Sequence, residues 1–139
     1  MNAKNYLRQV EKIDISIECK LVEQQMWRDI ATGITANMEG ERVQSSGSQS
    51  KMADAVGRCV DMEAEIDRLV DILIDTKKEV IQTIEQVQNP TWYKVLHMKY
   101  IRYMDLLAIA DEFNASYDWA KSAHSKALKI VQQILDERK

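Results

Sequence analysis

The chain has 139 residues, a formal net charge of −3, one Pro and four Gly. This length fits one domain, or one small domain with an extended helical element, and the shortage of helix breakers favours long helices over a turn-rich β fold. No run of eighteen apolar residues exists, which excludes a helical membrane span, and the start of the chain lacks the apolar core of a signal peptide. We therefore expect an intracellular, cytoplasmic protein without a membrane partner.

The residue types that carry chemistry are few and scattered. The sequence contains no Gly-rich phosphate-binding loop, no His/Cys cluster with metal-ligand spacing and no serine elbow, so we expect neither enzyme activity nor a cofactor. Cys19 and Cys59 are 40 residues apart, and neither belongs to a CxxC pair. We expect two buried, reduced thiols rather than a disulfide or a metal site.

Residues 2–34 have the pattern of one long helix. Apolar residues recur at steps of three and four with Glu and Lys between them, which predicts a narrow apolar seam. The seam positions are Val10, Ile13, Ile17, Leu21, Gln24, Ala31 and Ile34. Residues 36–50 are expected to form a loop, because two Gly and four Ser lie within Asn37–Ser50. A flexible tip is the simpler interpretation of this loop, and its length also invites a functional one.

Residues 51–88 form a second predicted helix of similar length. Its seam consists of Met52, Val56, Cys59, Ile66, Leu69, Leu73, Val80, Ile84 and Val87, and acidic residues crowd its other faces. Two such seams joined by a loop predict an antiparallel coiled-coil hairpin over residues 1–88. The expected fold is thus all-α, with this hairpin followed by a C-terminal tri-helical domain over residues 89–139.

The C-terminal domain begins with a helix-start signal. Asparagine is a preferred N-cap and proline is tolerated in the first helical turn, so Asn89–Pro90 predicts a helix over residues 90–103. Val95, Leu96 and Tyr100 are expected on its inner face.

A helix-turn-helix is predicted after this first helix. Asp105 and Ser116 are candidate N-caps of two helices, and Asn114 is suited to the turn between them because Asn tolerates the left-handed conformation. Ala110 is small enough for a close crossing of the two helices. The positions expected inside are Leu106, Ile109, Ala110, Phe113, Ala120, Ala123, His124, Ala127, Val131 and Ile134.

Candidate DNA-contacting residues lie on the opposite face of the last helix. Lysine ammonium groups pair with phosphates, whereas tyrosine and serine hydroxyls reach phosphates or base edges. The candidates are Tyr117, Lys121, Ser122, Ser125, Lys126 and Lys129. The charge distribution also favours DNA binding by the C-terminal part. Residues 92–139 contain eight Lys and Arg against six Asp and Glu, whereas residues 1–91 contain eleven against sixteen.

The same pattern has simpler interpretations. A tri-helical cap without DNA contact would have the same apolar positions, and its lysines would form an ordinary solvated face. Asp118 lies where the helix dipole favours a carboxylate, and it would repel phosphate although it can accept a hydrogen bond from cytosine N4. His124 is more simply a core residue than a ligand.

These residues resemble region 4 of σ70-type factors, which binds promoter DNA. More closely, the whole chain resembles the ArpU-like putative late-transcription regulators of phages and prophages. The motifs that carry this resemblance are MEGERVQSSG at Met38–Gly47, VLHMKYI at Val95–Ile101 and SYxWxxxxHxxAL at Ser116–Leu128. The resemblance implies sequence-specific binding of double-stranded DNA by residues 116–129 and contact with RNA polymerase.

The expected function is a phage-type transcription regulator that binds DNA, as a homodimer, through the C-terminal helix-turn-helix. The chain departs from the family pattern at Leu107, an apolar residue where polar ones are common, and we expect it to be an exposed contact for a protein partner. The alternatives are a helical protein-interaction module and a DNA-packaging component resembling small terminase subunits, neither of which reads DNA on its own.

Overall fold

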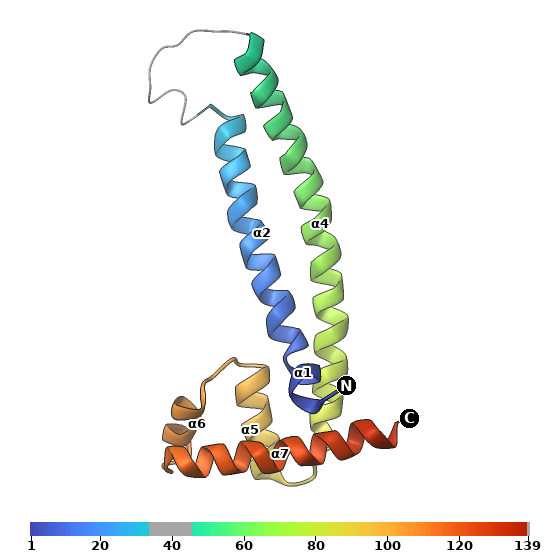
Figure 1. Cartoon of the computed structure of the whole chain (residues 1–139), viewed down its shortest axis with the longest axis vertical. Helices are drawn as coiled ribbons and strands as arrows, with labels where there is room; N and C mark the ends of the chain where they lie inside the picture. Colours follow the sequence, from blue (N-terminus) through green and yellow to red (C-terminus); the bar gives the residue numbers. More distant parts are fainter. Residues whose placement is uncertain (34–45, 139) are drawn as a thin grey trace. The chain divides into compact units, whose positions relative to one another are not determined.

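The computed structural model describes residues 1–33 and 46–138. Over these residues the structure is all-α, with six helices and no strand, which confirms the predicted fold class (Figure 1). No helix in these ranges is long and apolar enough to cross a membrane. The helices are α1 (Ala3–Leu7), α2 (Gln9–Ala31), α4 (Ser46–Glu85), α5 (Pro90–Tyr100), α6 (Leu106–Glu112) and α7 (Tyr117–Glu137).

Contacts between residues divide the chain into two compact units. Unit 1 comprises Met1–Ile13 and Leu73–Lys139, and unit 2 comprises Asp14–Ile72. These limits differ from the segments 1–88 and 89–139 expected from the sequence, because α1 and the last turns of α4 contribute to the same core as the C-terminal helices.

Unit 2 is an antiparallel pair formed by α2 and α4. Gln24 Nε2 donates to the carbonyl oxygen of Cys59 at 3.3 Å, and the Cys59 thiol donates to the carbonyl oxygen of Gln24 at 3.8 Å. Lys20 Nζ lies 3.1 Å from Glu65 Oε1. Residue numbers along α4 therefore decrease as those of their partners on α2 increase, so the two helices run in opposite directions. Ile17 and Ile66 are buried in the seam between the helices, as the sequence predicted.

Some seam positions of unit 2 differ from the prediction. Leu21 and Val56 are 48% and 50% exposed, whereas Ala55 is buried. Apolar spacing alone could not decide between Ala55 and its larger neighbour, and the structure places the smaller side chain in the seam. Cys59 is half-buried, but Cys19 is exposed, so the expectation that both thiols are buried is wrong for Cys19.

The ends of the hairpin helices also differ from the prediction. Helix α4 begins at Ser46, so residues 46–50, expected in the loop, are helical. Ser and Gly are well tolerated at a helix start, and their unfavourable propensity applies mainly to helix interiors. The rest of the expected loop, and Ile34 of the expected seam, lie outside the described residues. Helix α2 ends at Ala31, and Gly33 in the following turn has a φ of +72°, a left-handed conformation that glycine adopts without strain.

The single N-terminal helix predicted over residues 2–34 is instead divided in two. Helix α1 ends at Leu7 and α2 begins at Gln9, and Arg8 between them stays in the right-handed region with φ of −75° and ψ of −8°. Tertiary packing explains this division of the helix, because Ala3, Tyr6 and Leu7 of α1 are buried in the core of unit 1. The Ala3 backbone N–H also donates to Gln132 Oε1 of α7 at 2.8 Å.

The core of unit 1 joins α1 and the ends of α2 and α4 to α5 and α7. Its fully buried aliphatic side chains include Leu7, Val10, Val80, Ile84, Leu96 and Val131. A polar network lies beside them, in which the Tyr6 hydroxyl donates to Glu79 Oε2 at 2.8 Å and Arg138 donates to Thr83 Oγ1 at 2.8 Å. These bonds satisfy polar groups that would otherwise destabilise a buried position.

Candidate nucleic-acid interface

Helices α6 and α7 and the short turn between them form the predicted helix-turn-helix. Asp105 caps α6, with Oδ1 accepting from the Ala108 backbone N–H at 2.8 Å. Ser116 caps α7, with Oγ accepting from the Trp119 N–H at 3.0 Å. Both caps and the start of α5 at Asn89–Pro90 are confirmed. These side chains satisfy backbone donors at the helix starts and so fix where each helix begins.

The turn between α6 and α7 depends on one left-handed residue. Asn114 has φ of +52°, and the Ala115 N–H donates to the carbonyl oxygen of Ala110 at 2.9 Å. This bond closes the end of α6 and redirects the chain into α7, as expected for an asparagine at this position.

Replacing Asn114 tests this turn. We expect Asn114→Val to lower the free energy of unfolding by about 2 kcal/mol, because a β-branched side chain opposes positive φ. Asn114→Gly should stay within about 0.5 kcal/mol of the wild type, since glycine adopts this conformation freely. Urea unfolding followed by circular dichroism measures both, and equal losses in the two variants would contradict this account of the turn.

Small residues let the helices of this region pack closely. Ala110, Ala120 and Ala123 are buried, and Ala123 joins Val95, Met98 and Ile109 in a second core cluster between α5, α6 and α7. At the turn, the ring centroids of Phe113 and Trp119 lie 5.0 Å apart. The inner positions predicted for α7 are buried or half-buried.

The end of α5 differs from the prediction. The helix ends at Tyr100 rather than at residue 103, because Met104 N–H donates back to the Met98 carbonyl at 2.9 Å.

The structure places all six candidate DNA-contacting residues on the exposed surface of α7. Tyr117, Lys121, Ser122, Ser125, Lys126 and Lys129 are each exposed. Lys121 Nζ lies 5.7 Å from the centroid of the Tyr117 ring, a cation–π distance that joins the two side chains across one helical turn. Asp118 is also exposed and lies in the first turn of α7. The face is thus polar and mildly basic, and it extends along a helix of about 30 Å.

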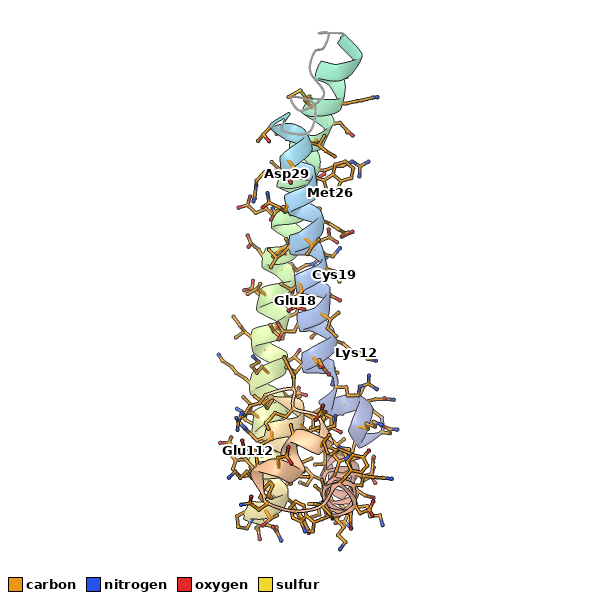
Figure 2. The ribbon with its side chains drawn as sticks, turned by 90° about the vertical axis from the view of Figure 1, so that its left-hand side faces the viewer. Lys12, Glu18, Cys19, Met26, Asp29 and Glu112 are labelled. Carbon is orange, nitrogen blue, oxygen red and sulfur yellow. The ribbon has the colours of Figure 1, made fainter. Side chains whose placement is uncertain are left out.

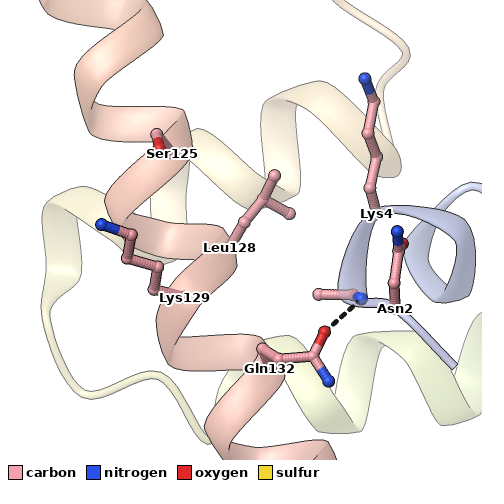
Figure 3. A pocket seen from close by; sticks show the side chains of 7 residues that line it. Asn2, Lys4, Ser125, Leu128, Lys129 and Gln132 are labelled. Atoms are coloured by element: carbon pink, nitrogen blue, oxygen red, sulfur yellow. Dashed lines mark hydrogen bonds between the residues drawn. The ribbon is translucent and has the colours of Figure 1, made fainter.

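Helix α1 lies beside this face, which the sequence did not indicate. A cavity of about 370 Å³ is lined by Ser125, Leu128, Lys129 and Gln132 of α7 together with Asn2, Ala3 and Lys4 (Figure 3). Two of the six candidates therefore share a surface with the start of the chain. The apolar residues Ala3, Tyr6 and Leu7 were the available signal, but on their own they fit the beginning of the long predicted helix equally well.

A second, smaller cavity is lined mainly by basic side chains. It has a volume of about 210 Å³ and is lined by Lys4, Arg8 and Lys99, together with Glu11 and Tyr100. Three cations against one carboxylate make a local positive potential that would attract an anionic group.

His124 lies near Lys4 and Lys99 of this cavity and is a buried core residue, as predicted. Its Nε2 atom lies 2.6 Å from the Tyr100 hydroxyl oxygen, and the two rings are stacked with centroids 5.6 Å apart. Burial, with Lys99 and Lys4 nearby, lowers the pKa of His124 from 6.5 to about 4. Burial also raises the pKa of Tyr100 to about 12. Both side chains are therefore neutral at pH 7 and form a buried hydrogen-bonded pair.

The lowered pKa of His124 predicts a pH dependence of stability. The unfolded chain binds a proton at this position below pH 6.5, whereas the folded chain does not until about pH 4. Stability that is fully present above pH 6.5 should therefore be lost as the pH falls towards 4, by about 3 kcal/mol, and change little below that. Unfolding of the wild type and of His124→Gln from pH 7.5 to 4 measures the difference, and parallel curves would contradict this role.

Charge is distributed unequally between the two units. Unit 1 contains thirteen Lys and Arg against ten Asp and Glu, whereas unit 2 contains six against twelve. The positive unit is the one that contains the candidate face. Among the described residues, no group of His, Cys, Asp or Glu is arranged to hold a metal ion, and both thiols are free.

Comparison with known proteins identifies the family but not its activity. Residues 34–132 match the family described as "Protein of unknown function (DUF1492)". This match covers more than half of the chain, so the protein belongs to that family. The matched segment includes α4, α5, α6 and most of α7, whereas α1 and α2 precede it. Searches of curated proteins and of solved structures found no match.

Proposed function

We propose that this member of the DUF1492 family is a phage-type transcription regulator that binds double-stranded DNA through the α6–α7 helix-turn-helix and performs no chemistry. The observation that carries the proposal is the exposed face of α7. Six polar or basic side chains gather there, on a helix whose start is fixed by the Ser116 cap and the left-handed turn at Asn114. Helix-turn-helix proteins use such a helix to read the DNA major groove.

The proposed contacts follow from position along α7. The first turns of a recognition helix approach the base edges, so Tyr117, Lys121 and Ser122 are assigned to base or nearby phosphate contacts. Lys126 and Lys129 lie further along the helix and are assigned to phosphates, where an ammonium group binds without regard to sequence. Asp118 repels phosphate and favours a cytosine N4 amino group as its partner.

Helix α1 extends this proposed surface. Lys4 lines the cavity that also contains Ser125 and Lys129, and it lines the smaller basic cavity with Arg8 and Lys99. Of these cations, Lys4 shares a cavity with Ser125 and Lys129, so a DNA backbone that passes along α7 would approach it. They offset the modest charge of the α7 face itself, which has an acid in its first turn.

The resemblance of Ser116–Leu128 to ArpU-like regulators and to σ70 region 4 supports the same proposal. The resemblance implies that the DNA target is a late-gene control region and that the protein partner is RNA polymerase. Leu107 is 59% exposed on α6, and an exposed leucine next to a DNA-reading helix is suited to such a protein contact.

Selection of bound duplexes from a random DNA pool, followed by gel-shift titration at several salt concentrations, tests the proposal. We expect enrichment of a defined sequence, and an affinity that falls steeply as salt rises because phosphate contacts release counterions. Absence of salt-sensitive binding at micromolar protein, with and without RNA polymerase, would contradict it.

A second candidate function is a protein-interaction module or a DNA-packaging component that does not read DNA. The specific observation in its favour is the number of exposed apolar side chains in unit 2, including Val22 at 71% and Val60 at 62%. A ring-shaped oligomer in solution combined with no sequence selection from the DNA pool would favour this candidate over the first.

A further inference from the structure

Helix α2 carries a second apolar stripe, separate from its seam with α4. Ile15, Val22 and Met26 are 50%, 71% and 47% exposed, and Cys19 between them is exposed as well. These four residues recur at steps of four, three and four along one uninterrupted helix. A single exposed apolar residue needs no explanation, but a regular row of them marks a surface that another molecule covers.

The stripe lies on the side of α2 that faces away from α4. At about 100° per residue, Met26 is turned by roughly 180° from Ile17, which is buried in the seam. Gln24, which bonds to Cys59 of α4, is on the seam side as well. Figure 2 shows Cys19 and Met26 along the near side of α2, between Lys12 and Asp29 of the same helix.

The spacing is that of a coiled-coil seam with charged ends. Lys12 precedes Ile15 by three residues, and Asp29 follows Met26 by three, so the order is Lys12, Ile15, Cys19, Val22, Met26 and Asp29. Alternating steps of three and four define the a and d positions of a heptad repeat, and such a row packs against a second helix of matching pattern.

This row is complementary to itself when two copies of α2 run in opposite directions. Antiparallel pairing about the level between Lys20 and Leu21 places Ile15 opposite Met26 and Cys19 opposite Val22 of the second copy. The same register places Lys12 opposite Asp29 at both ends. In a parallel pair each residue would instead face its own copy, with lysine against lysine and aspartate against aspartate.

The charges therefore specify both the partner and its direction. Opposite charges at each end stabilise the antiparallel pair, whereas like charges in register destabilise the parallel one. Asp29 accepts one hydrogen bond from Gln25 Nε2 at 2.9 Å, and a carboxylate has room for further donors.

We propose that α2 is the contact surface between two copies of this chain, which pair antiparallel through the Ile15–Met26 stripe. This inference does not depend on the proposed DNA binding. The contact is about 25 Å long, from the rise of a helix over residues 12–29, and is smaller than a standard protein interface. We therefore expect a dimer with a dissociation constant in the micromolar range.

Sedimentation equilibrium of the full chain tests the surface. Wild-type protein at about 100 µM is expected to be mainly dimeric, and Val22→Asp should weaken the dimer at least about tenfold by burying a charge in the contact. Val60→Asp is the matched control, because Val60 is also an exposed valine of unit 2 but lies on α4. It should leave the dimer intact, and far-ultraviolet circular dichroism confirms that each variant remains helical.

Charge reversal tests the direction of pairing. Lys12→Asp and Asp29→Lys should each weaken the dimer, because each places like charges together at both ends. The double variant restores opposite charges and should recover the wild-type dissociation constant to within about threefold. A monomeric wild type at 100 µM, equal losses in the Val22 and Val60 variants, or no recovery in the double variant would each overturn the proposal. A monomer would mean that a different molecule covers the stripe.

Discussion

Replacing both Lys126 and Lys129 by glutamate is expected to lower the affinity for duplex DNA on the order of 100-fold at about 0.15 M salt. Each lysine that neutralises a phosphate contributes roughly fivefold under these conditions through counterion release, and a glutamate adds repulsion. Both side chains are exposed on α7, so the change should leave the fold intact. Fluorescence anisotropy of a labelled duplex over a range of salt concentrations measures the loss.

The salt dependence separates this effect from a general change in charge. The slope of log affinity against log salt should decrease by about one for each lost lysine contact. Lys51→Glu combined with Arg68→Glu is the matched control, since it changes the net charge equally at exposed positions of unit 2. If this control lost as much affinity as the α7 variant, binding would depend on overall charge rather than on the α7 face.

Replacing Leu96 by alanine is expected to lower the free energy of unfolding by about 3 kcal/mol. Leu96 lies on α5 and is fully buried among side chains of the unit 1 core. Truncation removes its apolar contacts and leaves a cavity that rigid neighbouring helices fill only in part. Denaturation in urea should show a lower midpoint with an unchanged slope, because the surface exposed on unfolding is nearly the same.

Leu107→Ala is the control for this experiment, because it is the same substitution in the same unit. Leu107 is 59% exposed on α6, so its truncation should change the free energy of unfolding by no more than about 0.5 kcal/mol. Similar losses in the two variants would mean that the unit 1 core does not lie where the structure places it.

The helix-turn-helix could be predicted from the sequence because its signals are local. Asp105 and Ser116 act as caps, and Asn114 adopts positive φ, each within three residues of the bond or conformation that it determines. The period of small and apolar residues then specifies which side of α7 is buried. A local sequence pattern of this kind is sufficient, because no distant segment is needed to decide it.

The features that could not be predicted depend on distant segments. The break at Arg8 arises because α1 packs against α7, more than a hundred residues away in the sequence. The choice of Ala55 rather than Val56 for the hairpin seam depends on how closely α2 approaches, which spacing does not reveal. The same holds for Cys19, since a helix with two apolar rows does not indicate which of them α4 covers.

The position of bound DNA on the protein tests most directly whether the α7 face binds DNA. Amide chemical shifts of isotope-labelled protein, titrated with a selected duplex, report which residues meet the DNA. We expect the largest changes on Tyr117–Lys129 of α7, with smaller ones at Lys4 and its neighbours on α1. Changes confined to the α2–α4 pair of unit 2, or no changes at saturating duplex, would contradict it.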